Sequence, residues 1–191
     1  YHMMSGQDLL LVSNSKFDDF FAKNMGKEFV DFKDYQNEHD PEIKRRTKLY
    51  HLLQNYRRRF KYQFLNEIFI FFERCLLALQ IVLHINRVKN LNWKIKLGSE
   101  WFSITDNLVK NILKNESKLR KIFKLTNCSD ELLVQTVAFN GGFMSHMYHN
   151  LYGEDNMRLV DFSRGKNGSP YTFTIYDKDL LRKSNASKVM H

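Results

Sequence analysis

A long apolar run, "IFIFFERCLLALQIVLHI" at residues 68–85, constrains the fold more than any other part of the chain. It approaches the length of a membrane span, but Glu73, Arg74 and Gln80 interrupt it. Because a charged residue near the centre of a span costs roughly 2.5–3.5 kcal/mol, a spanning helix is disfavoured. The run predicts a helix buried in the protein core, and a membrane-surface or dimer helix is the alternative.

Basic residues on both sides of this run keep the membrane-surface alternative open. Lys61 precedes it, within "NYRRRFKY", and Arg87 and Lys89 follow it. The whole chain has a formal net charge of +9, which favours an anionic partner: nucleic acid, a membrane surface or the diphosphate of an activated sugar. The interleaved basic and aromatic residues of "NYRRRFKY" are typical of single-stranded nucleic-acid surfaces, but also of a solvated helix face.

Composition indicates a folded chain in a reducing setting. Of the 191 residues, 43% are hydrophobic and only two are proline, as in globular proteins. The two cysteines, Cys75 and Cys128, form neither a disulfide framework nor a zinc pattern. The opening "YHMMSGQDLLL" does not have the order of regions of a secretory signal. We therefore expect a cytosolic environment.

The remaining patterns alternate between helix and strand. Asn14 or Ser15 is predicted to cap a first helix, with Gly26 at its end, and Pro41 to open the next. Thr105 should cap a third helix and Asp177 the last one. Strands are predicted at residues 28–32, at 93–103 with a break at Gly98-Ser99, at 158–162 and at 171–175. This alternation predicts an α/β architecture, with three layers.

Two patterns raise the possibility of a metal site. Asp177 and Asp179 form an Asp-x-Asp after a predicted strand, and carboxylate oxygens suit a hard cation, but Asp177 also stands where a helix cap is needed. His146 and His149 lie three residues apart without a third ligand at characteristic spacing. Helix capping and surface or packing roles are favoured, and no metal site is expected.

Asp130 and Glu131, in "TNCSDELLVQTVAFN" at residues 126–140, directly precede an apolar run. The dipole at a helix N-terminus stabilises carboxylates in the first turn, and it also keeps a base ionised at neutral pH. Judged by residue pattern alone, a helix that starts at Ser129 is favoured over a catalytic role for either carboxylate.

Four stretches that follow one another along the chain carry a family resemblance. They are "YHMMSGQDLLLVSNSKFDDFFAKNMGKEFV", "GSEWFSITDNLVKNIL", "TNCSDELLVQTVAFN" and "MRLVDFSRGKNGSPYTFTIYDKDLL". Together they resemble the core-2/I-branching β-1,6-N-acetylglucosaminyltransferases, the glycosyltransferase family that includes the peptide O-xylosyltransferases. With its two cysteines, the chain is more similar to the bacterial branch of that family than to the cysteine-rich Golgi branch.

The resemblance implies a modified GT-A fold of three layers and an inverting, metal-independent transfer of a sugar, expected to be N-acetylglucosamine. The donor would be a UDP-sugar and the acceptor a glycan hydroxyl, with no further cofactor and no nucleic-acid partner. The family's base is the Glu of a Pro-Asp-Glu segment, which falls on Glu131, with Ser129 in place of Pro and Asp130 retained. The resemblance thus makes Glu131 the expected catalytic base.

The resemblance also implies two groups of binding residues. Cations that neutralise the leaving diphosphate are assigned to Arg164, Lys166 and Lys188, although "SNASKVMH" lacks the family's Ala-Arg-Lys-Phe-like segment. Asp8 and Glu100 are expected to bond to sugar hydroxyls and Trp101 to pack on a sugar face. The full set of acceptor or cleft residues is Ser5, Gly6, Gln7, Asp8, Lys44, Arg45, Arg46, Gly98, Ser99, Glu100 and Trp101.

Residues 1–191 are expected to form a single glycosyltransferase domain, the C-terminal portion of the GT-A-like fold. The family's N-terminal nucleotide-binding βα units would precede "YHMMSGQD", so by itself this chain is expected to hold UDP weakly. We expect it in the bacterial cytoplasm or at the cytoplasmic face of the membrane, with peripheral membrane association. The alternatives are a basic module that binds nucleic acid or an anionic surface, and a truncated, inactive relative that binds glycan.

Overall fold

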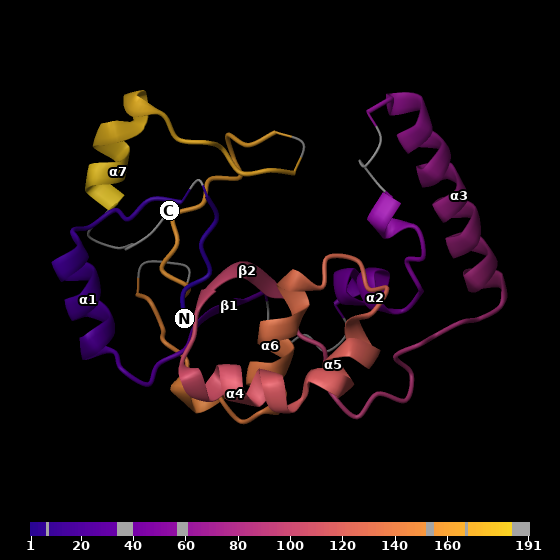
Figure 1. The fold of residues 1–191 in the computed structure, drawn as a ribbon, viewed down its shortest axis with the longest axis horizontal. Coiled ribbons are helices and arrows are strands. Elements are labelled where there is room, and N and C mark those ends of the chain that lie inside the picture. The colour runs from indigo at the N-terminus through magenta and orange to yellow at the C-terminus, as the bar shows by residue number, and fades with distance from the viewer. Residues whose placement is uncertain (7, 34–39, 57–60, 152–154, 167, 185–191) are drawn as a thin grey trace. The chain divides into compact units, whose positions relative to one another are not determined.

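The computed structural model describes residues 1–6, 8–33, 40–56, 61–151, 155–166 and 168–184 (Figure 1). The chain divides into two compact units, which we describe separately. The first unit comprises Tyr1–Asp31, Ser99–Asn107 and Phe143–His191, and the second comprises Phe32–Gly98 and Leu108–Gly142.

Helices predominate over strands in the described residues, and two strands, β1 and β2, pair into one small sheet. The elements in chain order are α1 (Asn14–Lys23), β1 (Phe29–Phe32), α2 (Pro41–Thr47), η1 (Gln54–Tyr56), α3 (Gln63–Val82), β2 (Gly98–Ser103), α4 (Asp106–Lys114), α5 (Glu116–Phe123), α6 (Asp130–Asn140), η2 (Met144–His146), η3 (Ile175–Asp177) and α7 (Lys178–Ser184). This mixture agrees with the predicted α/β class, while the three-layered GT-A-like arrangement stays a prediction.

An aromatic cluster forms the core of the first unit. Phe17, Phe20 and Phe21 of α1 pack against Phe29 of β1, which is 2% exposed. The ring of Tyr148 stacks on Phe29, with 4.5 Å between the centroids. Offset and edge-to-face contacts of this kind stabilise beyond simple area burial, so these rings fix α1 on the sheet.

The predicted start of α1 is wrong by one or two residues. Ser13, rather than Asn14 or Ser15, is the N-cap, and its hydroxyl accepts a bond from the backbone of Lys16. Gly26, at φ 83°, lies in the turn that follows the helix. The left-handed region is open to glycine at little cost, which explains the residue at this turn.

The buried carboxylate of Glu28 joins three segments of the first unit. It accepts bonds from the backbone nitrogen of Thr105 at 2.8 Å and from its hydroxyl at 2.6 Å. The Glu28 backbone also exchanges hydrogen bonds with His146 and Tyr148. One buried charge therefore holds the start of β1 against the segment after β2.

Helices α4, α5 and α6 contribute most of the core of the second unit. Leu108, Leu119 and Leu132 are buried, one from each helix, as are most residues of α6. α6 buries polar Gln135 and Thr136 along with its apolar residues, and Thr136 accepts a bond from the backbone of Lys96 at 3.0 Å. α6 is thus the central helix of this unit.

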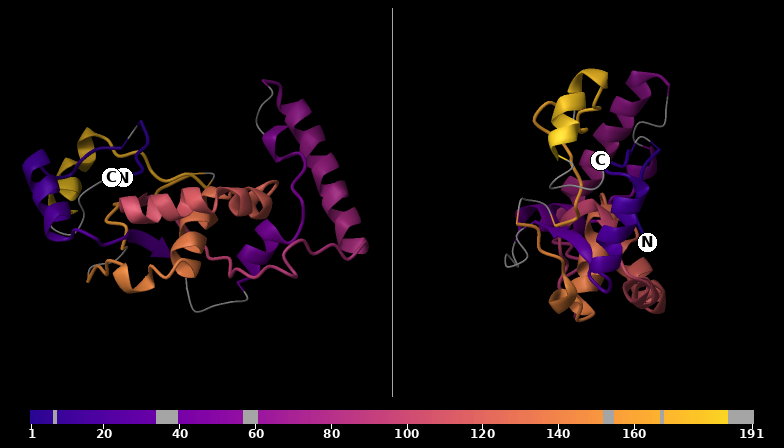
Figure 2. Two further views of the ribbon diagram at one scale, coloured as in Figure 1. Left: turned by 60° about the horizontal axis from the view of Figure 1, so that its bottom comes forward. Right: turned by 90° about the vertical axis from the view of Figure 1, so that its left-hand side faces the viewer.

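The long apolar run forms a helix, as predicted, but the prediction that this helix is buried in the core is wrong. The helix itself, α3, forms as one unbroken element (Figure 2). Its buried residues, however, are Glu73 and Gln80, whereas Phe71 and Val82 are largely exposed. Gln80 bonds to both the backbone nitrogen and the carbonyl of Tyr50, which draws the polar face inward. Among the described residues, no helix is long and apolar enough to cross a membrane.

Three of the predicted strands do not form. Residues 158–162 and 171–175 run without strand structure and are joined by a bond from the Tyr171 nitrogen to the Asp161 carbonyl. Residues 93–97 are not a strand either, and β2 begins at Gly98 instead of breaking there. Asn140 and Thr136 of α6 bond to the backbone of this segment, so side chains take the place of a neighbouring strand.

Replacing Thr105 by Val should lower the free energy of unfolding by about 1–3 kcal/mol, because it removes a hydroxyl that bonds to the buried Glu28 carboxylate. Thr105→Ser keeps that hydroxyl and should stay within about 1 kcal/mol of the wild type. Urea unfolding curves of both variants test this. Equal stability of Thr105→Val and Thr105→Ser would contradict a stabilising role for the bond.

Candidate functional site

The first turn of α6 presents the predicted base. The helix predicted to start at Ser129 begins at Asp130, with Ser129 as its N-cap residue, and the Ser129 carbonyl accepts bonds from the nitrogens of Leu132 and Leu133. Asp130 is exposed and Glu131 follows it with a third of its side chain accessible. The acidic first turn thus has the geometry expected of a helix start, and it leaves the Glu131 carboxylate open to a ligand.

The Glu131 carboxylate is held by Arg46 of α2. Nη1 of Arg46 lies 2.8 Å from Oε2 of Glu131, and Nη2 lies 2.5 Å from Oε1 of Glu42. The Arg46 side chain is only 9% exposed, and its Nε is buried without a hydrogen-bond partner among the described residues. Burial lowers the pKa of Arg46, but the bonds to Glu131 and Glu42 raise it by more. The guanidinium is a buried, permanently charged link between two carboxylates.

Glu42 extends this link to the surface. Its carboxylate lies 2.5 Å from the ammonium of Lys33, which is the main reason why the pKa of Glu42 is lowered. Arg45 approaches Glu42 at 3.7 Å and is mostly exposed, as is Lys44. Of the three basic residues expected on the acceptor side, Lys44 and Arg45 thus face solvent, while Arg46 turns inward to Glu131.

The turn that leads into α6 is conformationally strained. Leu125, at φ 63°, and Cys128, at φ 48°, are both in the left-handed region that side chains with a Cβ disfavour. Each such residue costs of the order of 1–3 kcal/mol, which surrounding contacts must offset. Asn127, between them, donates a backbone bond to the carbonyl of Arg46 at 3.3 Å. The same arginine therefore anchors this turn and the carboxylate that follows it.

Arg87 holds the other end of the turn. Its Nη2 donates to the carbonyls of Ile122 and Lys124 at 2.6 and 2.7 Å, where α5 ends, and its Nη1 lies 3.2 Å from the Thr126 hydroxyl. Helix C-termini leave carbonyls without intrahelical partners, so a guanidinium is a suitable cap there. Burial lowers the pKa of Arg87. The sequence predicts Arg87 only as a basic residue that flanks the long apolar run.

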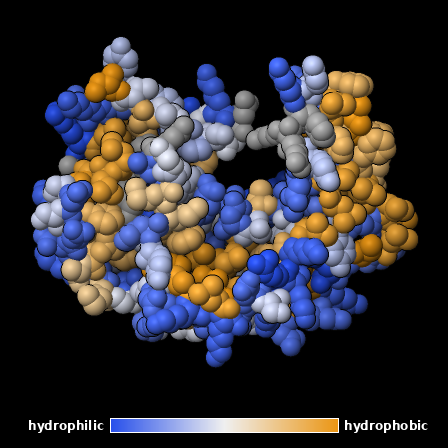
Figure 3. Space-filling view, in the orientation of Figure 1, coloured by the Kyte–Doolittle hydropathy of each residue, from blue (hydrophilic) through white to orange (hydrophobic). Residues whose placement is uncertain are grey.

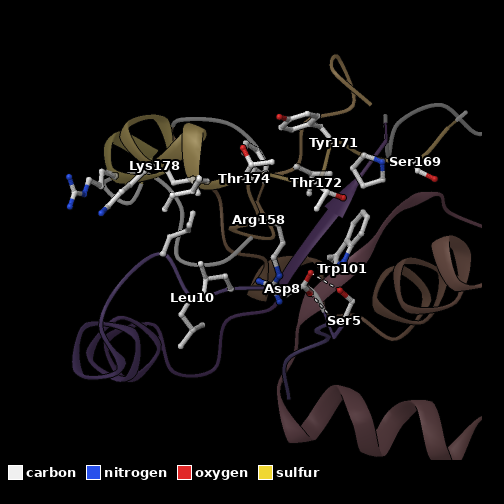
Figure 4. Close-up of a pocket in the computed structure, with 18 residues that line it drawn as sticks. Ser5, Asp8, Leu10, Trp101, Arg158, Ser169, Tyr171, Thr172, Thr174 and Lys178 are labelled. Carbon is white, nitrogen blue, oxygen red and sulfur yellow. Dashed lines mark hydrogen bonds between the residues drawn. The ribbon is translucent and has the colours of Figure 1, made fainter. Parts of the chain in front are cut away.

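A cavity of about 740 Å³ lies in the first unit and gathers several of the predicted cleft residues (Figure 4). Ser5, Asp8 and Trp101 line it, from two segments far apart in the sequence. Asp8 accepts bonds from the Ser5 backbone nitrogen at 2.6 Å and from the Ser5 hydroxyl at 2.8 Å. Ser5 and Asp8 of "SGQD" and Trp101 of "GSEW" thus line one cavity.

Other residues that line this cavity were not predicted from the sequence, chiefly Arg158, Tyr171, Lys178 and Arg182. Arg158 is 1% exposed, and its guanidinium donates to the carbonyl oxygens of Asn156, Phe102 and Met3 and to the Ser103 hydroxyl, at 2.8–3.2 Å. Burial lowers the pKa of Arg158 to about 10, so it stays charged at neutral pH. A basic residue inside the apolar "MRLV" was the available signal.

The other predicted cleft residues that the structure describes do not line the cavity. Gly98, Ser99 and Glu100 are half-buried in β2, and Ser99 accepts bonds from the Asn156 amide and the Trp101 backbone. Gly6 is exposed. Gln7 and Lys188 lie outside the described residues, as do Arg57, Arg58 and Arg59, on which the nucleic-acid alternative depended.

Arg164 is engaged within its own loop. It bonds to Asp161 at 2.6 Å and to Asp177 at 2.7 Å, and its guanidinium stacks 4.1 Å from the centroid of the Tyr171 ring. Those carboxylates raise its pKa. The backbone of Lys166 forms an isolated antiparallel β-bridge with Ser169, and Lys166 is exposed. Neither Arg164 nor Lys166 lines the cavity, so the structure offers Lys178 and Arg182 as nearer cations.

The candidate metal residues are used in other ways. The carboxylate of Asp177 accepts bonds from the nitrogen and hydroxyl of Thr174 in a capping box at the start of the short helix η3, instead of capping the last helix as predicted. These bonds and Arg164 lower the pKa of Asp177 to about 2. Asp179 is exposed, and His149 pairs with Asp155 at 3.0 Å. The part of the chain that the structure describes contains no group of three metal-type ligands.

The family model of the Core-2/I-Branching enzymes matches residues 3–183, nearly the entire chain. The chain belongs to this family. It is a family of glycosyltransferases, so the predicted resemblance is confirmed and the protein is placed among the transferases. No curated protein matches the sequence significantly.

Removing the Arg46 guanidinium should destabilise the protein, because two carboxylates would lose their common partner. For Arg46→Met we expect the free energy of unfolding to fall by about 1–3 kcal/mol, since both carboxylates are partly exposed. The neighbouring Arg45→Met is the matched control, and an exposed charge should change stability by less than about 0.5 kcal/mol. Equal unfolding midpoints for the two variants would show that the Arg46 bridge does not stabilise the fold.

Proposed function

We propose that the protein is an inverting, metal-independent glycosyltransferase that moves a sugar, N-acetylglucosamine by preference, from a UDP-sugar to a glycan hydroxyl in polysaccharide or glycan biosynthesis. Glu131 is the proposed base. The observation that carries this proposal is the carboxylate of Glu131, fixed through one oxygen by a buried arginine and a third exposed to incoming ligand. Family membership supplies the reaction class.

The proposed step is a single displacement at the anomeric carbon. The acceptor hydroxyl attacks from the face opposite UDP, and a bond forms between its oxygen and that carbon while the bond from the carbon to the phosphate oxygen breaks. The hydroxyl proton passes to the Glu131 carboxylate, and UDP leaves with the electron pair. Because Arg46 is bonded to Oε2 of Glu131, Oε1 is the oxygen assigned to the proton.

Arg46 is proposed as a positioning residue for this base. A carboxylate on the first turn of a helix retains side-chain freedom, and a base must come within roughly 2.6–3.2 Å of the proton that it takes. The buried guanidinium removes that freedom, and Glu42 in turn fixes the guanidinium. Charges of alternating sign therefore run from Lys33 through Glu42 and Arg46 to Glu131.

The cavity of the first unit is proposed to hold sugar and phosphate groups of the substrates. Trp101 and Tyr171 offer aromatic faces for a sugar ring, and Asp8 offers an acceptor for hydroxyls. Lys178 and Arg182 offer positive charge for a diphosphate. Fixed cations aimed at a leaving diphosphate stabilise the developing charge without a metal ion.

Replacing Glu131 by Gln should lower the turnover number by about a hundredfold or more, because general base catalysis contributes roughly 10²–10⁴ in rate. The assay is UDP release from UDP-N-acetylglucosamine on an array of glycans, with the product checked by mass. Asp130→Asn, the exposed neighbour, is the matched control and should keep most of the activity. Circular dichroism and the unfolding midpoint establish that both variants are folded.

Wild-type turnover of Glu131→Gln would overturn the assignment of the base. The same assay with EDTA tests the metal-independent mechanism. Transfer should persist in the chelator, and strict dependence on added Mn²⁺ would contradict that part of the proposal.

Replacing Lys178 and Arg182 by Ala together should raise the dissociation constant of UDP about a hundredfold or more, since each charge-assisted bond to phosphate is worth roughly 1.5–3 kcal/mol. Lys183→Ala is the control, because it removes a cation from α7 that does not line the cavity. Calorimetric titration of UDP measures both. Unchanged affinity for UDP in the double variant would show that the diphosphate does not bind in this cavity.

A further inference from the structure

The outward face of α3 is an apolar surface that the described residues leave exposed. Figure 3 shows hydrophobic residues gathered over this helix, at the right of the view. Phe64 is 70% exposed, Phe71 63% and Val82 71%, and they run from the first turn of the helix to its last. Single exposed apolar residues are common on proteins, but a stripe along twenty residues marks an interaction surface.

Helical spacing places these residues in one line. Phe64, Phe71, Cys75 and Val82 are separated by seven, four and seven positions, intervals that return to the same face of an α-helix. Cys75 is exposed, in keeping with its place on this stripe. We refer to the stripe of Phe64, Phe71, Cys75 and Val82 as the outer stripe of α3.

The inward face of α3 is fixed by polar contacts, so the helix cannot rotate to bury the outer stripe. The Gln80 amide bonds to both backbone groups of Tyr50, at 2.8 and 3.0 Å. The buried Glu73 carboxylate lies 3.4 Å from Nδ1 of the buried His51. Rotation would break the bonds between Gln80 and Tyr50 and leave their buried polar groups unpaired, which costs more free energy than leaving the outer stripe exposed.

Charge indicates which partner covers the outer stripe. The unit that contains α3 has 20 lysines and arginines against nine acidic residues, a net charge of +11, whereas the other unit has ten against twelve. Lys61 lies just before α3, Arg74 lies on its surface and Lys89 follows it, and all three are exposed. A second copy would bring the same positive charge to the contact, which opposes association, whereas an anionic surface attracts it.

We propose that the outer stripe of α3 binds the surface of an anionic phospholipid bilayer. The helix would lie along the interface, with its apolar residues among the upper acyl chains and the surrounding lysines and arginines at the phosphate groups. Its polar side stays bonded to Tyr50 through Gln80, and Glu73 stays buried beside His51. The second unit thereby gains a peripheral membrane contact that is independent of the proposed transfer reaction.

Cosedimentation with lipid vesicles tests this surface. The protein should bind vesicles of phosphatidylglycerol and phosphatidylcholine, bind pure phosphatidylcholine at least tenfold more weakly, and dissociate partly at high salt. Phe71→Gln with Val82→Gln should weaken binding by about tenfold or more, because two apolar side chains leave the acyl region. The matched control is Leu151→Gln with Ile175→Gln, two exposed apolar residues of the other unit, and it should bind as the wild type does.

The two exposed cysteines of the chain provide a second measurement. In Cys128→Ser, an environment-sensitive fluorophore attached to Cys75 should shift to the blue with anionic vesicles and be quenched by spin-labelled lipids. In Cys75→Ser, the emission of the same fluorophore attached to Cys128 should change little when anionic vesicles are added. This comparison reports where the protein meets the lipid even if a variant at α3 has reduced stability.

Several outcomes would overturn the proposal. One is equal vesicle binding by the wild type and the α3 variant, and another is a larger lipid response from Cys128 than from Cys75. A third is a concentration-dependent dimer, seen in analytical ultracentrifugation, that the α3 variant abolishes while vesicles are not bound. That result would assign the outer stripe to a second copy of the chain.

Discussion

The buried guanidinium of Arg46 is the interaction on which the candidate site depends. It joins two carboxylates from different helices, Glu42 of α2 and Glu131 of α6, and its own carbonyl accepts a bond from Asn127 in the strained turn between them. A planar donor with two arms can serve both carboxylates at once, which the single ammonium of a lysine cannot do in the same geometry. The position of the proposed base is therefore set by an arginine distant in the sequence.

The two functional surfaces that we propose in the second unit use polar groups in opposite ways. At α6, a buried cation directs a carboxylate toward ligand. At α3, buried polar residues Glu73 and Gln80 hold one side of the helix and leave apolar residues facing out. In both places a buried polar contact decides which side chain faces out of the protein. Breaking that contact would cost more free energy than exposing the side chain that it orients.

Most helices are predictable from the sequence, whereas the strands predicted near the C-terminus do not form. Helix starts depend on local caps and spacing, which are legible in the sequence. The segment before β2 does not pair as a strand, because its backbone bonds to the side chains of Asn140 and Thr136 of α6. No local sequence pattern reveals partners of that kind. Arg158 was missed for the same reason, since its burial depends on carbonyl groups of Met3 and Phe102 far along the chain.

The sequence by itself determined the family, the acidic start of α6 at Asp130 and Glu131, and the existence of a long helix at α3, because these depend on ordered motifs and local periodicity. Only the tertiary structure decided that Arg46 turns inward to Glu131 and that α3 buries its polar side. Those outcomes depend on pairing between residues that are 85 and about 30 positions apart. Burial of a charge is favourable only when such a partner is in place.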